Sequence, residues 1–420
     1  MISTKNAKRA GAVLALVASA VLAACSSSGG TSSTNGSSTN SSSGAASGSG
    51  TSGSAVVVGV PYPIQTQATA PTPEIGLAVA AMVKWVNAHG GIKGHPIQAV
   101  SCDDHFTSTG TASCVQQFAS NSNMVALVGG DDCFADAANA LLKSSGLPWL
   151  ASYGCSANSY TGSEFTLLGG GVVADALAVG TLIAQEKTPA EIITFNLPQA
   201  DVIVSSTTAS AAAAGGKVLG AVRVDPAAVD MTAAVAQALK SHPQAIVPET
   251  SSAQIASTVQ ALKQDGFTGK IILAATEVPA NTLASLNGAS GQIIGASSTA
   301  PVEAPGASLP AITEFRTEMT AQGATTSQMT SQAFETWLAF HQFYDAAQKV
   351  TSVTRANILT ASRGLANWQY GQSNPPMTFS APGPFTGFPN IVMHWAAFMT
   401  VQNNHWVWDG KWTNLATSGG

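Results

Sequence analysis

The stretch VALVGGDDCFADAANALLKSSGLPWLASYGC, residues 125–155, contains the pattern that decides the fold. Its first residues, Val125-Ala126-Leu127-Val128, form a short apolar run without alternation, which is typical of a strand covered on both faces. Gly129-Gly130 ends this run and allows a sharp backbone turn. Asp131 or Asp132 then stands where a helix N-cap belongs. The pattern predicts a buried strand followed by a polar turn and a helix.

The same stretch continues into a second strand. Gly146 follows the last helical turn, and Trp149-Leu150-Ala151 is again short and apolar. Polar residues follow both strands, Asp131-Asp132-Cys133 after the first and Ser152-Tyr153-Gly154-Cys155 after the second. Because ligands bind outside the carboxyl ends of the strands in open parallel sheets, we expect this stretch to form one wall of a binding site.

Length and charge narrow the class of protein. A chain of 420 residues is long for one domain and suggests two lobes. Only 9% of its residues are charged, and the formal net charge is −5. Residues 1–24 contain Lys5, Lys8 and Arg9 and no acid, so their removal changes the charge to −8. The remainder lacks the basic character of a nucleic-acid-binding protein.

The N-terminus has the features of a lipoprotein signal peptide over residues 1–24. Basic residues precede an apolar segment, Ala10 to Val21, that is too short to span a membrane. Leu22-Ala23-Ala24-Cys25 resembles a bacterial lipobox, in which the cysteine receives the lipid, including palmitate. We therefore expect lipidation at Cys25. The alternative is an ordinary signal peptide in which the cysteine stands by chance.

Residues 25–54 follow as a tether. After Cys25 they contain only Ser, Gly, Thr, Asn and Ala, which cannot bury enough apolar surface to fold. Such a flexible segment spans roughly 30 Å on average. No later run is long and apolar enough for a transmembrane helix. We expect a folded body that starts near Ala55 and is anchored by lipid to the outer face of the bacterial cell membrane.

Four further cysteines indicate two disulfides in an exported chain: Cys102, Cys114, Cys133 and Cys155. Three pairings are possible. We favour 102–114, which closes a short loop between a strand and the next helix, and 133–155, which joins the ends of two neighbouring strands. A zinc site is the alternative, but no CxxC spacing supports it.

Two successive series of alternating strands and helices extend from residue 55 to 274, with a break near 165–190. This arrangement predicts two open α/β lobes rather than one barrel. Gly291 to Ser297 is predicted as a strand that crosses between the lobes. Helices are expected at 309–323, 331–350 and 354–367, and strands at 391–400 and 405–408.

Several motifs, taken in order, resemble the branched-chain amino-acid (leucine)-binding proteins, type I solute-binding proteins of ABC importers. Asn87-Ala88-His89-Gly90-Gly91-Ile92-Lys93-Gly94, followed by Cys102-Asp103-Asp104, resembles a first-lobe segment of the family. Val125–Gly130 and Gly146–Leu150 resemble its next two strand-helix units. Ala274–Asn281 resembles the second-lobe loop with its binding glutamate, here Glu277. The similarity extends unevenly over most of 55–410.

The resemblance implies a type I periplasmic binding protein fold: two doubly wound α/β lobes joined by a three-segment hinge, with the ligand held in the cleft between them. Lobe 1 would comprise 55–170, with 298–350 returning to it. Lobe 2 would comprise 171–297, with 351–420 contributing to this lobe and to the hinge. The implied partners are a small-molecule ligand and ABC permease subunits, with the binding protein itself a monomer.

Carried over by position, the family's ligand loops give eight candidate ligand-binding residues: Tyr62, Asp132, Cys133, Phe134, Tyr153, Glu249, Ser251 and Glu277. Glu277 fits the role of the glutamate that takes a ligand ammonium. Asp132 stands near a position where serine is usual, and an acid would repel a ligand carboxylate, so an α-amino acid ligand is in doubt. Simpler roles are open too: helix capping for Asp131 or Asp132, packing for the aromatic residues, and a solvated loop for each glutamate.

Catalytic motifs are missing from the sequence. It contains no G-x-x-x-x-G-K-[ST], G-x-S-x-G or H-E-x-x-H, and its G-x-G-x-x-G match at 48–53 lies in the Ser/Gly-rich tether, where no strand and helix flank it. We expect no enzyme activity, no cofactor, no metal site and no nucleic-acid partner. The predicted function is capture of a small polar ligand, such as an amino acid or amide, for an ABC importer. The alternative is a ligand-sensing lipoprotein of the same fold, and an enzyme is the third possibility.

Overall fold

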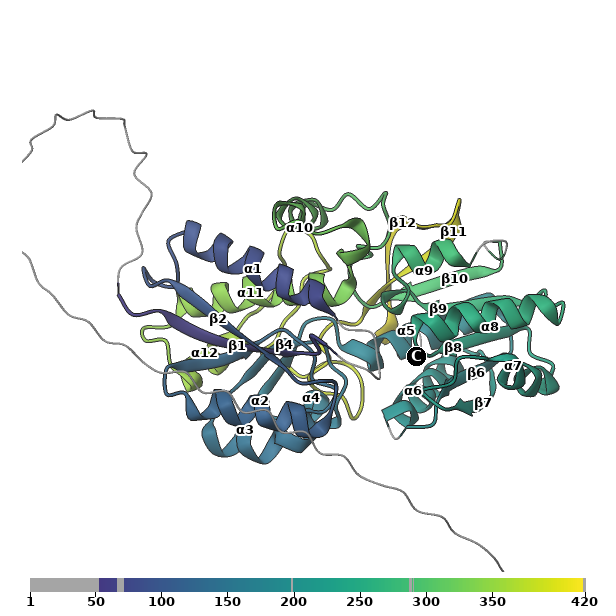
Figure 1. Cartoon of the computed structure of the whole chain (residues 1–420), viewed down its shortest axis with the longest axis horizontal. Helices are drawn as coiled ribbons and strands as arrows, with labels where there is room; N and C mark the ends of the chain where they lie inside the picture. Colours follow the sequence, from purple (N-terminus) through teal and green to yellow (C-terminus); the bar gives the residue numbers. More distant parts are fainter. Residues whose placement is uncertain (1–52, 66–71, 198, 287–288, 290, 418–420) are drawn as a thin grey trace, which may run out of the picture. The chain divides into compact units, whose positions relative to one another are not determined.

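The computed structural model describes residues 53–65, 72–197, 199–286, 289 and 291–417 and contains two β-sheets (Figure 1). The predicted lipidation site Cys25, the signal peptide and nearly all of the tether lie outside these residues. None of the helices in the described ranges combines the length and the apolar character that a bilayer-spanning segment needs.

The first sheet has five parallel strands in the order β2-β1-β3-β4-β5. Its strands are β1 (Val56–Tyr62), β2 (Ile97–Asp103), β3 (Met124–Val128), β4 (Trp149–Ser152) and β5 (Phe165–Leu167). The helices that connect or follow them are α1 (Pro73–Ala88), α2 (Ser108–Ser120), α3 (Asn139–Ser145) and α4 (Ala157–Thr161). Alternate residues of β1 pack in different core clusters, Val58 with the α1 side and Val57 with the α2 side. The sheet is thus covered on both faces.

The second sheet has seven strands in the order β12-β11-β10-β9-β8-β6-β7. Its strands are β6 (Ala190–Phe195), β7 (Val218–Val224), β8 (Ala245–Glu249), β9 (Lys270–Ala274), β10 (Ile293–Ser297), β11 (Trp395–Gln402) and β12 (His405–Asn414). The helices associated with it are α5 (Gly171–Glu186), α6 (Gln199–Ala213), α7 (Thr232–Ala238), α8 (Ser252–Gln264) and α9 (Ala280–Ser285). Strands β6 to β10 are parallel, whereas β11 and β12 form an antiparallel hairpin at the edge.

Three later helices return to the first sheet: α10 (Pro310–Ala321), α11 (Ser331–Lys349) and α12 (Arg355–Arg363). Helix α11 contacts α1, β3 and β4, and α12 contacts α11 and β3. The Arg355 guanidinium fixes α12 by donating hydrogen bonds to the backbone carbonyls of Met124, Ser145, Ala119 and Asn121.

The predicted alternation of strands and helices in two series is confirmed, but two details differ. Ile293–Ser297 does not cross between sheets, because it pairs with β9 and β11 inside the second sheet. Neither Asp131 nor Asp132 caps a helix. The helical segment begins later, as a short 3-10 turn at Ala135–Ala138 whose N-cap residue is Phe134. The two aspartates are therefore available for other contacts.

Both favoured disulfides are present, Cys102–Cys114 and Cys133–Cys155. The first links β2 to α2, and the second links the turn after β3 to the turn after β4. The second disulfide thus fixes together the two segments that were predicted to form one wall of a binding site.

Candidate functional site

Asp132 organises the wall at the ends of β3 and β4. Its side chain is 0% exposed and accepts hydrogen bonds from Ser152 Oγ (2.5 Å), the Cys155 backbone N–H (2.8 Å) and the Ser156 backbone N–H (3.2 Å). Burial raises the pKa of Asp132 to about 7, against the effect of these donors. Asp132 therefore holds the turn after β4 in place.

Strand β4 has a bulge two residues before Tyr153. Ala151 has a positive φ of 54°, and the pairing with β5 shifts between Leu150 and Ser152. A bulge of this kind changes the direction in which the following side chains point. The Tyr153 hydroxyl donates a hydrogen bond of 2.8 Å to Glu277 Oε1, which belongs to the turn after β9 of the second sheet. Polar groups from the strand ends of both sheets thus meet directly.

Glu277 belongs to a group of acids on the second sheet. Its neighbour Thr276 donates through Oγ1 to Asp175 Oδ2 of α5 at 2.8 Å, and the Ser298 backbone N–H donates to Asp175 Oδ1 at 2.9 Å. Tyr153 also lies near enough to Asp175 to lower its pKa, although burial raises that pKa overall. Asp175 therefore links the turn after β9 to the segment that follows β10.

Glu249 ends β8 in the same region. Its Oε1 is fully buried and has no hydrogen-bond partner in the described residues, and the same holds for Oγ1 of the adjacent Thr250. Removal of water raises the pKa of Glu249 to about 8, and the negative charges of Asp175 and Glu277 add to this effect. On the first sheet, burial raises the pKa of Asp131 well above its usual range, and the charge of Glu277 contributes to that rise.

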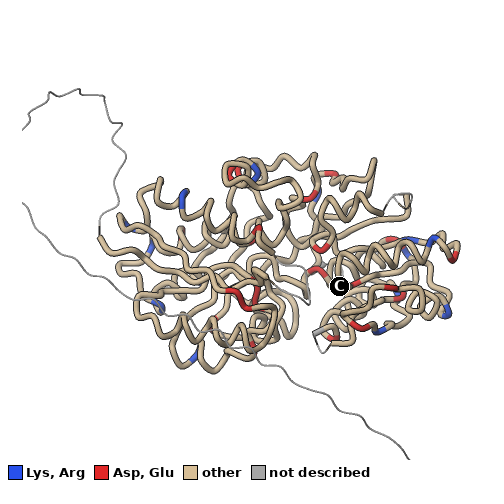
Figure 2. Tube along the Cα trace, in the orientation of Figure 1, with Lys and Arg blue, Asp and Glu red and all other residues tan. Residues whose placement is uncertain are grey.

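Within the described part of the chain, no ion pair joins a basic side chain to these acids. The ion pairs among the described residues join other acids, such as Arg223 with Asp201 and Lys270 with Glu186. Figure 2 shows acidic positions in the centre of the view, where elements of both sheets meet, and basic positions mostly farther out. The raised pKa values of Glu249 and Asp131 favour their neutral carboxyl forms, and a nearby positive charge would favour the charged forms.

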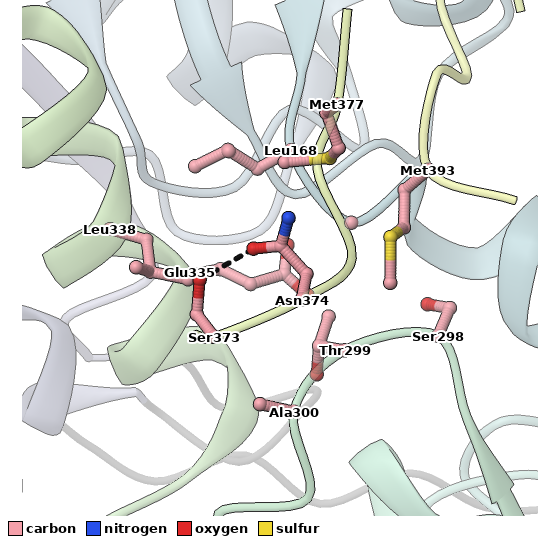
Figure 3. A pocket seen from close by; sticks show the side chains of 11 residues that line it. Leu168, Ser298, Thr299, Ala300, Glu335, Leu338, Ser373, Asn374, Met377 and Met393 are labelled. Atoms are coloured by element: carbon pink, nitrogen blue, oxygen red, sulfur yellow. Dashed lines mark hydrogen bonds between the residues drawn. The ribbon is translucent and has the colours of Figure 1, made fainter. Parts of the chain in front are cut away.

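Glu335 of α11 adds an acid from the core of the first sheet. It is 2% exposed, and neither carboxyl oxygen has a hydrogen-bond partner in the described part of the chain. Burial raises its pKa well above the ordinary value, and the charges of Asp175, Glu303 and Glu277 add to this. Figure 3 shows its side chain in a cavity of about 10 Å³, bordered by Ser298 and Thr299.

Replacing Glu335 by methionine is expected to stabilise the protein by about 1–2 kcal/mol, because an apolar side chain of similar length removes two buried oxygens without partners. Urea unfolding at pH 7.5 measures this change. The control is Glu303→Met, which should destabilise, since Glu303 Oε1 accepts hydrogen bonds from Ser331 N and Oγ at 2.7 Å. A stability loss in Glu335→Met would show that its carboxyl is paired in solution.

A larger cavity of about 490 Å³ lies beside the Cys133–Cys155 disulfide. Its walls come from five regions: the start of α2 at Ser108, the turn after β3, the segment around α4, helix α6 and the loop at 387–388. The lining is mainly apolar and includes Phe134, Tyr160, Val202, Phe388 and the disulfide. The volume falls in the range of sites for small organic ligands.

The predicted candidates divide into three groups. Tyr153, Glu249 and Glu277 meet in the acidic site, and Cys133 and Phe134 line the 490 Å³ cavity. Asp132 lies behind the wall, at 0% exposure. Tyr62 is buried with its hydroxyl near Gly76 of α1, and Ser251 caps α8 by accepting a hydrogen bond from the Gln254 backbone N–H.

Four acids of the site were not among the eight candidate residues: Asp131, Asp175, Glu303 and Glu335. Asp175 carried a usable signal, because it is the one acid in the otherwise apolar stretch GVVADALAVGTLIAQ of α5. A lone acid within the apolar, mostly buried part of a helix is expected to have a specific partner or role. Glu335 lies in the aromatic-rich α11, whose sequence pattern predicts a buried helix but does not distinguish Glu335 from an exposed acid.

The Asp131 carboxylate and the sulfurs of Cys133 and Cys155 lie within 4.8 Å of one another. Because the two sulfurs are bonded to each other, they are not available as thiolate ligands for a metal. The arrangement instead places the Asp131 carboxylate next to the disulfide that lines the larger cavity.

Comparison with known proteins agrees with this architecture. A family model described as "Periplasmic binding protein" matches residues 55–402. No curated protein sequence matches the chain. Similar solved structures include a fatty acid ABC transporter substrate-binding protein from Thermomonospora curvata, with a TM-score of 0.74 and 18% identity over 87% of this chain and 95% of that one.

Two further structures are similar at comparable levels. A solute-binding protein of an R. palustris ABC transporter, in complex with 4-hydroxybenzoate, has a TM-score of 0.71 and 14% identity, and covers 86% of this chain and 97% of its own. A possible leucine/isoleucine/valine-binding protein from Rhodopirellula baltica has a TM-score of 0.70 and 14% identity, and covers 84% and 96%. At these identities the likeness shows the fold.

Proposed function

Because the chain belongs to the periplasmic binding protein family and has its type I fold, we propose that it captures a small polar ligand between its two lobes and delivers it to an ABC importer. The family binds small molecules outside the cytoplasm and works with ABC permeases. The lobes of the proposal are the bodies built on the two sheets, 55–170 with 298–350 and 171–297 with parts of 351–420. The proposed mechanism contains no catalytic step.

The hydrogen bond between Tyr153 and Glu277 is the observation that carries this proposal. It joins the carboxyl ends of strands from two different sheets, where ligands bind in open α/β structures. A ligand that contacts both groups favours the closed arrangement of the lobes through its differential contacts. Tyr153, Glu249 and Glu277 are the proposed contact residues, and Asp132 positions the turn that carries Tyr153.

The lipobox resemblance supports anchoring through Cys25, with residues 25–54 as the tether. The protein would then work as a lipid-anchored monomer on the outer face of the membrane. Uptake of the ligand by cells that contain or lack the cognate permease separates delivery from sensing, because a sensor binds the ligand without supporting its uptake.

Glu277→Ala is expected to abolish the thermal stabilisation that a bound ligand gives, since it removes the acid that faces Tyr153. The measurement is a thermal-shift screen of amino acids, amides, polyols and amines on both proteins. The control is Glu191→Ala, which removes an acid of β6 that bonds to Ser241 instead. Ligand-induced stabilisation that persists in Glu277→Ala would remove Glu277 from the site.

A further inference from the structure

We propose that the ligand is an organic cation, an ammonium group joined to an apolar body and without a carboxylate. The ammonium would lie among Asp131, Glu249 and Glu277, and the apolar body would occupy the 490 Å³ cavity beside the Cys133–Cys155 disulfide. This inference rests on the proposed function and narrows its ligand class.

The ammonium position is defined by acids that lack a counter-charge. Glu249 has a fully buried oxygen without a hydrogen-bond partner among the described residues, and Glu277 has the Tyr153 hydroxyl as its side-chain donor. Asp131 uses Oδ1 to accept from the Cys133 backbone N–H at 2.8 Å. The charges that act on these carboxyls come from other acids. A bound cation would supply the missing positive charge and donors.

Glu335 gives a second and independent indication of a missing cation. It lies on α11 beside Ser298 and Thr299, is 2% exposed, and has no hydrogen-bond partner for either oxygen in the described structure. The charges of Asp175 and Glu277 both act on it. A buried acid without a partner is costly, and a nearby positive charge reduces that cost. The whole acidic group is therefore arranged to receive positive charge.

The cavity supplies a place for the rest of the molecule. The sulfurs of Cys133 and Cys155 line it and lie within 4.8 Å of the Asp131 carboxylate. An ammonium group at Asp131 can thus carry a substituent that extends over the disulfide toward Phe134, which packs edge-to-face on Phe106 at 5.1 Å. Tyr160 and Phe388, also edge-to-face with ring centroids 5.5 Å apart, form a second aromatic wall.

A ligand carboxylate is disfavoured at both ends of this space. At the acidic end it would lie beside Asp131 and Glu277, where like charges repel. In the cavity, the described lining residues include Asp136 and no lysine, arginine or histidine. An amine therefore fits where the corresponding amino acid or carboxylic acid does not.

Four probes with the same phenyl body test this assignment by calorimetry and thermal shift at pH 8.5: 2-phenylethylamine, phenylalanine, 3-phenylpropanoate and 2-phenylethanol. We expect 2-phenylethylamine to bind at least tenfold more tightly than phenylalanine and the alcohol, and 3-phenylpropanoate to bind least. Phenylalanine or 3-phenylpropanoate binding as tightly as the amine would overturn the inference. So would a complete absence of amine binding.

Two variants separate the ammonium position from the cavity. Glu277→Gln should weaken 2-phenylethylamine at least tenfold, whereas Glu191→Gln should leave it unchanged. Phe388→Ala should weaken 2-phenylethylamine about tenfold but leave ethylamine, which lacks the phenyl body, nearly unchanged. Equal weakening of both amines by Phe388→Ala would overturn the assignment of the cavity to the apolar body.

The inference and the proposed function fail in different ways. If an amino acid, amide or polyol stabilises the protein in the wider screen while 2-phenylethylamine does not, the inference is wrong and the binding function stands. If no compound of any class stabilises the protein, and cells lacking the cognate permease show unchanged uptake of every compound tested, both are wrong.

Discussion

Replacing Asp132 by alanine should lower the free energy of unfolding by about 3–5 kcal/mol, because it leaves three buried donors without an acceptor. These donors are Ser152 Oγ and the backbone N–H groups of Cys155 and Ser156, all of which bond to a carboxylate at 0% exposure. Urea unfolding with the Cys133–Cys155 disulfide intact measures the loss. Ligand affinity should fall as well, since the turn carries Tyr153.

The chain offers a matched control for this prediction. Asp136 also accepts three hydrogen bonds from the segment after β4, from Ala157 N and from Asn158 N and Nδ2, but its side chain is exposed. Water can accept these hydrogen bonds when the Asp136 carboxylate is removed, so Asp136→Ala should lower the free energy of unfolding by about 1 kcal/mol or less. Equal losses in the two variants would show that Asp132 is not the organising residue of the turn.

Without ligand, the protein should become less stable by about 3–4 kcal/mol between pH 6.5 and 8.5. Three acids set the direction, because the folded state raises the pKa of Glu249 to about 8 and those of Glu303 and Asp132 to about 7. The folded state holds these protons while the unfolded state has lost them. Their stabilising contribution is therefore complete below the ordinary carboxyl pKa and disappears as the pH rises through 7 and 8.

The range from pH 6.5 to 8.5 lies above most of the titration of His341, whose effect on stability has the opposite sign. Burial lowers the pKa of His341 to about 3, so this histidine favours the folded state increasingly as the pH rises toward 6.5 and changes little above it. The melting temperature should fall by roughly 5 °C across the window. Glu249→Gln should remove about half of that slope, while Asp230→Asn, at an exposed acid, should not change it. A melting temperature that is constant or rises from pH 6.5 to 8.5 would contradict the assignment.

Most of the fold could be predicted because its signals are local. The run Val125–Val128 and its glycines mark a buried strand whatever surrounds it, and similar runs locate the other strands of both sheets. The edge position of the β11–β12 hairpin could not be predicted as readily, since β11 pairs with β10 across about 100 residues of sequence. Helix capping was mispredicted at Asp132 because donors from the turn after β4 occupy its carboxylate, and at Asp131 because its carboxylate accepts from the Cys133 N–H before the helical turn begins.

The site was predictable in part. Glu277 could be located because a family motif surrounds it, and Glu249 because it ends a strand. Asp132 looked like a ligand contact, and only the turn at Ala151, with its positive φ, brings Ser152 and Cys155 onto it. The cavity could not be predicted, since Val202 and Phe388 reach it from segments far from residues 125–155.

The hydroxyl of Tyr153 has a consequence for selectivity. Before any ligand arrives, Glu277 already has a donor within the protein, at 2.8 Å. An incoming molecule shares the Glu277 carboxylate with this internal donor or displaces it, and a neutral hydroxyl or amide offers Glu277 little that tyrosine does not. A charged donor makes a stronger hydrogen bond to a carboxylate than a phenol does. Selection for a charged donor is thus built into the site, because a ligand's hydrogen bond to Glu277 is compared with the one that the Tyr153 hydroxyl already makes.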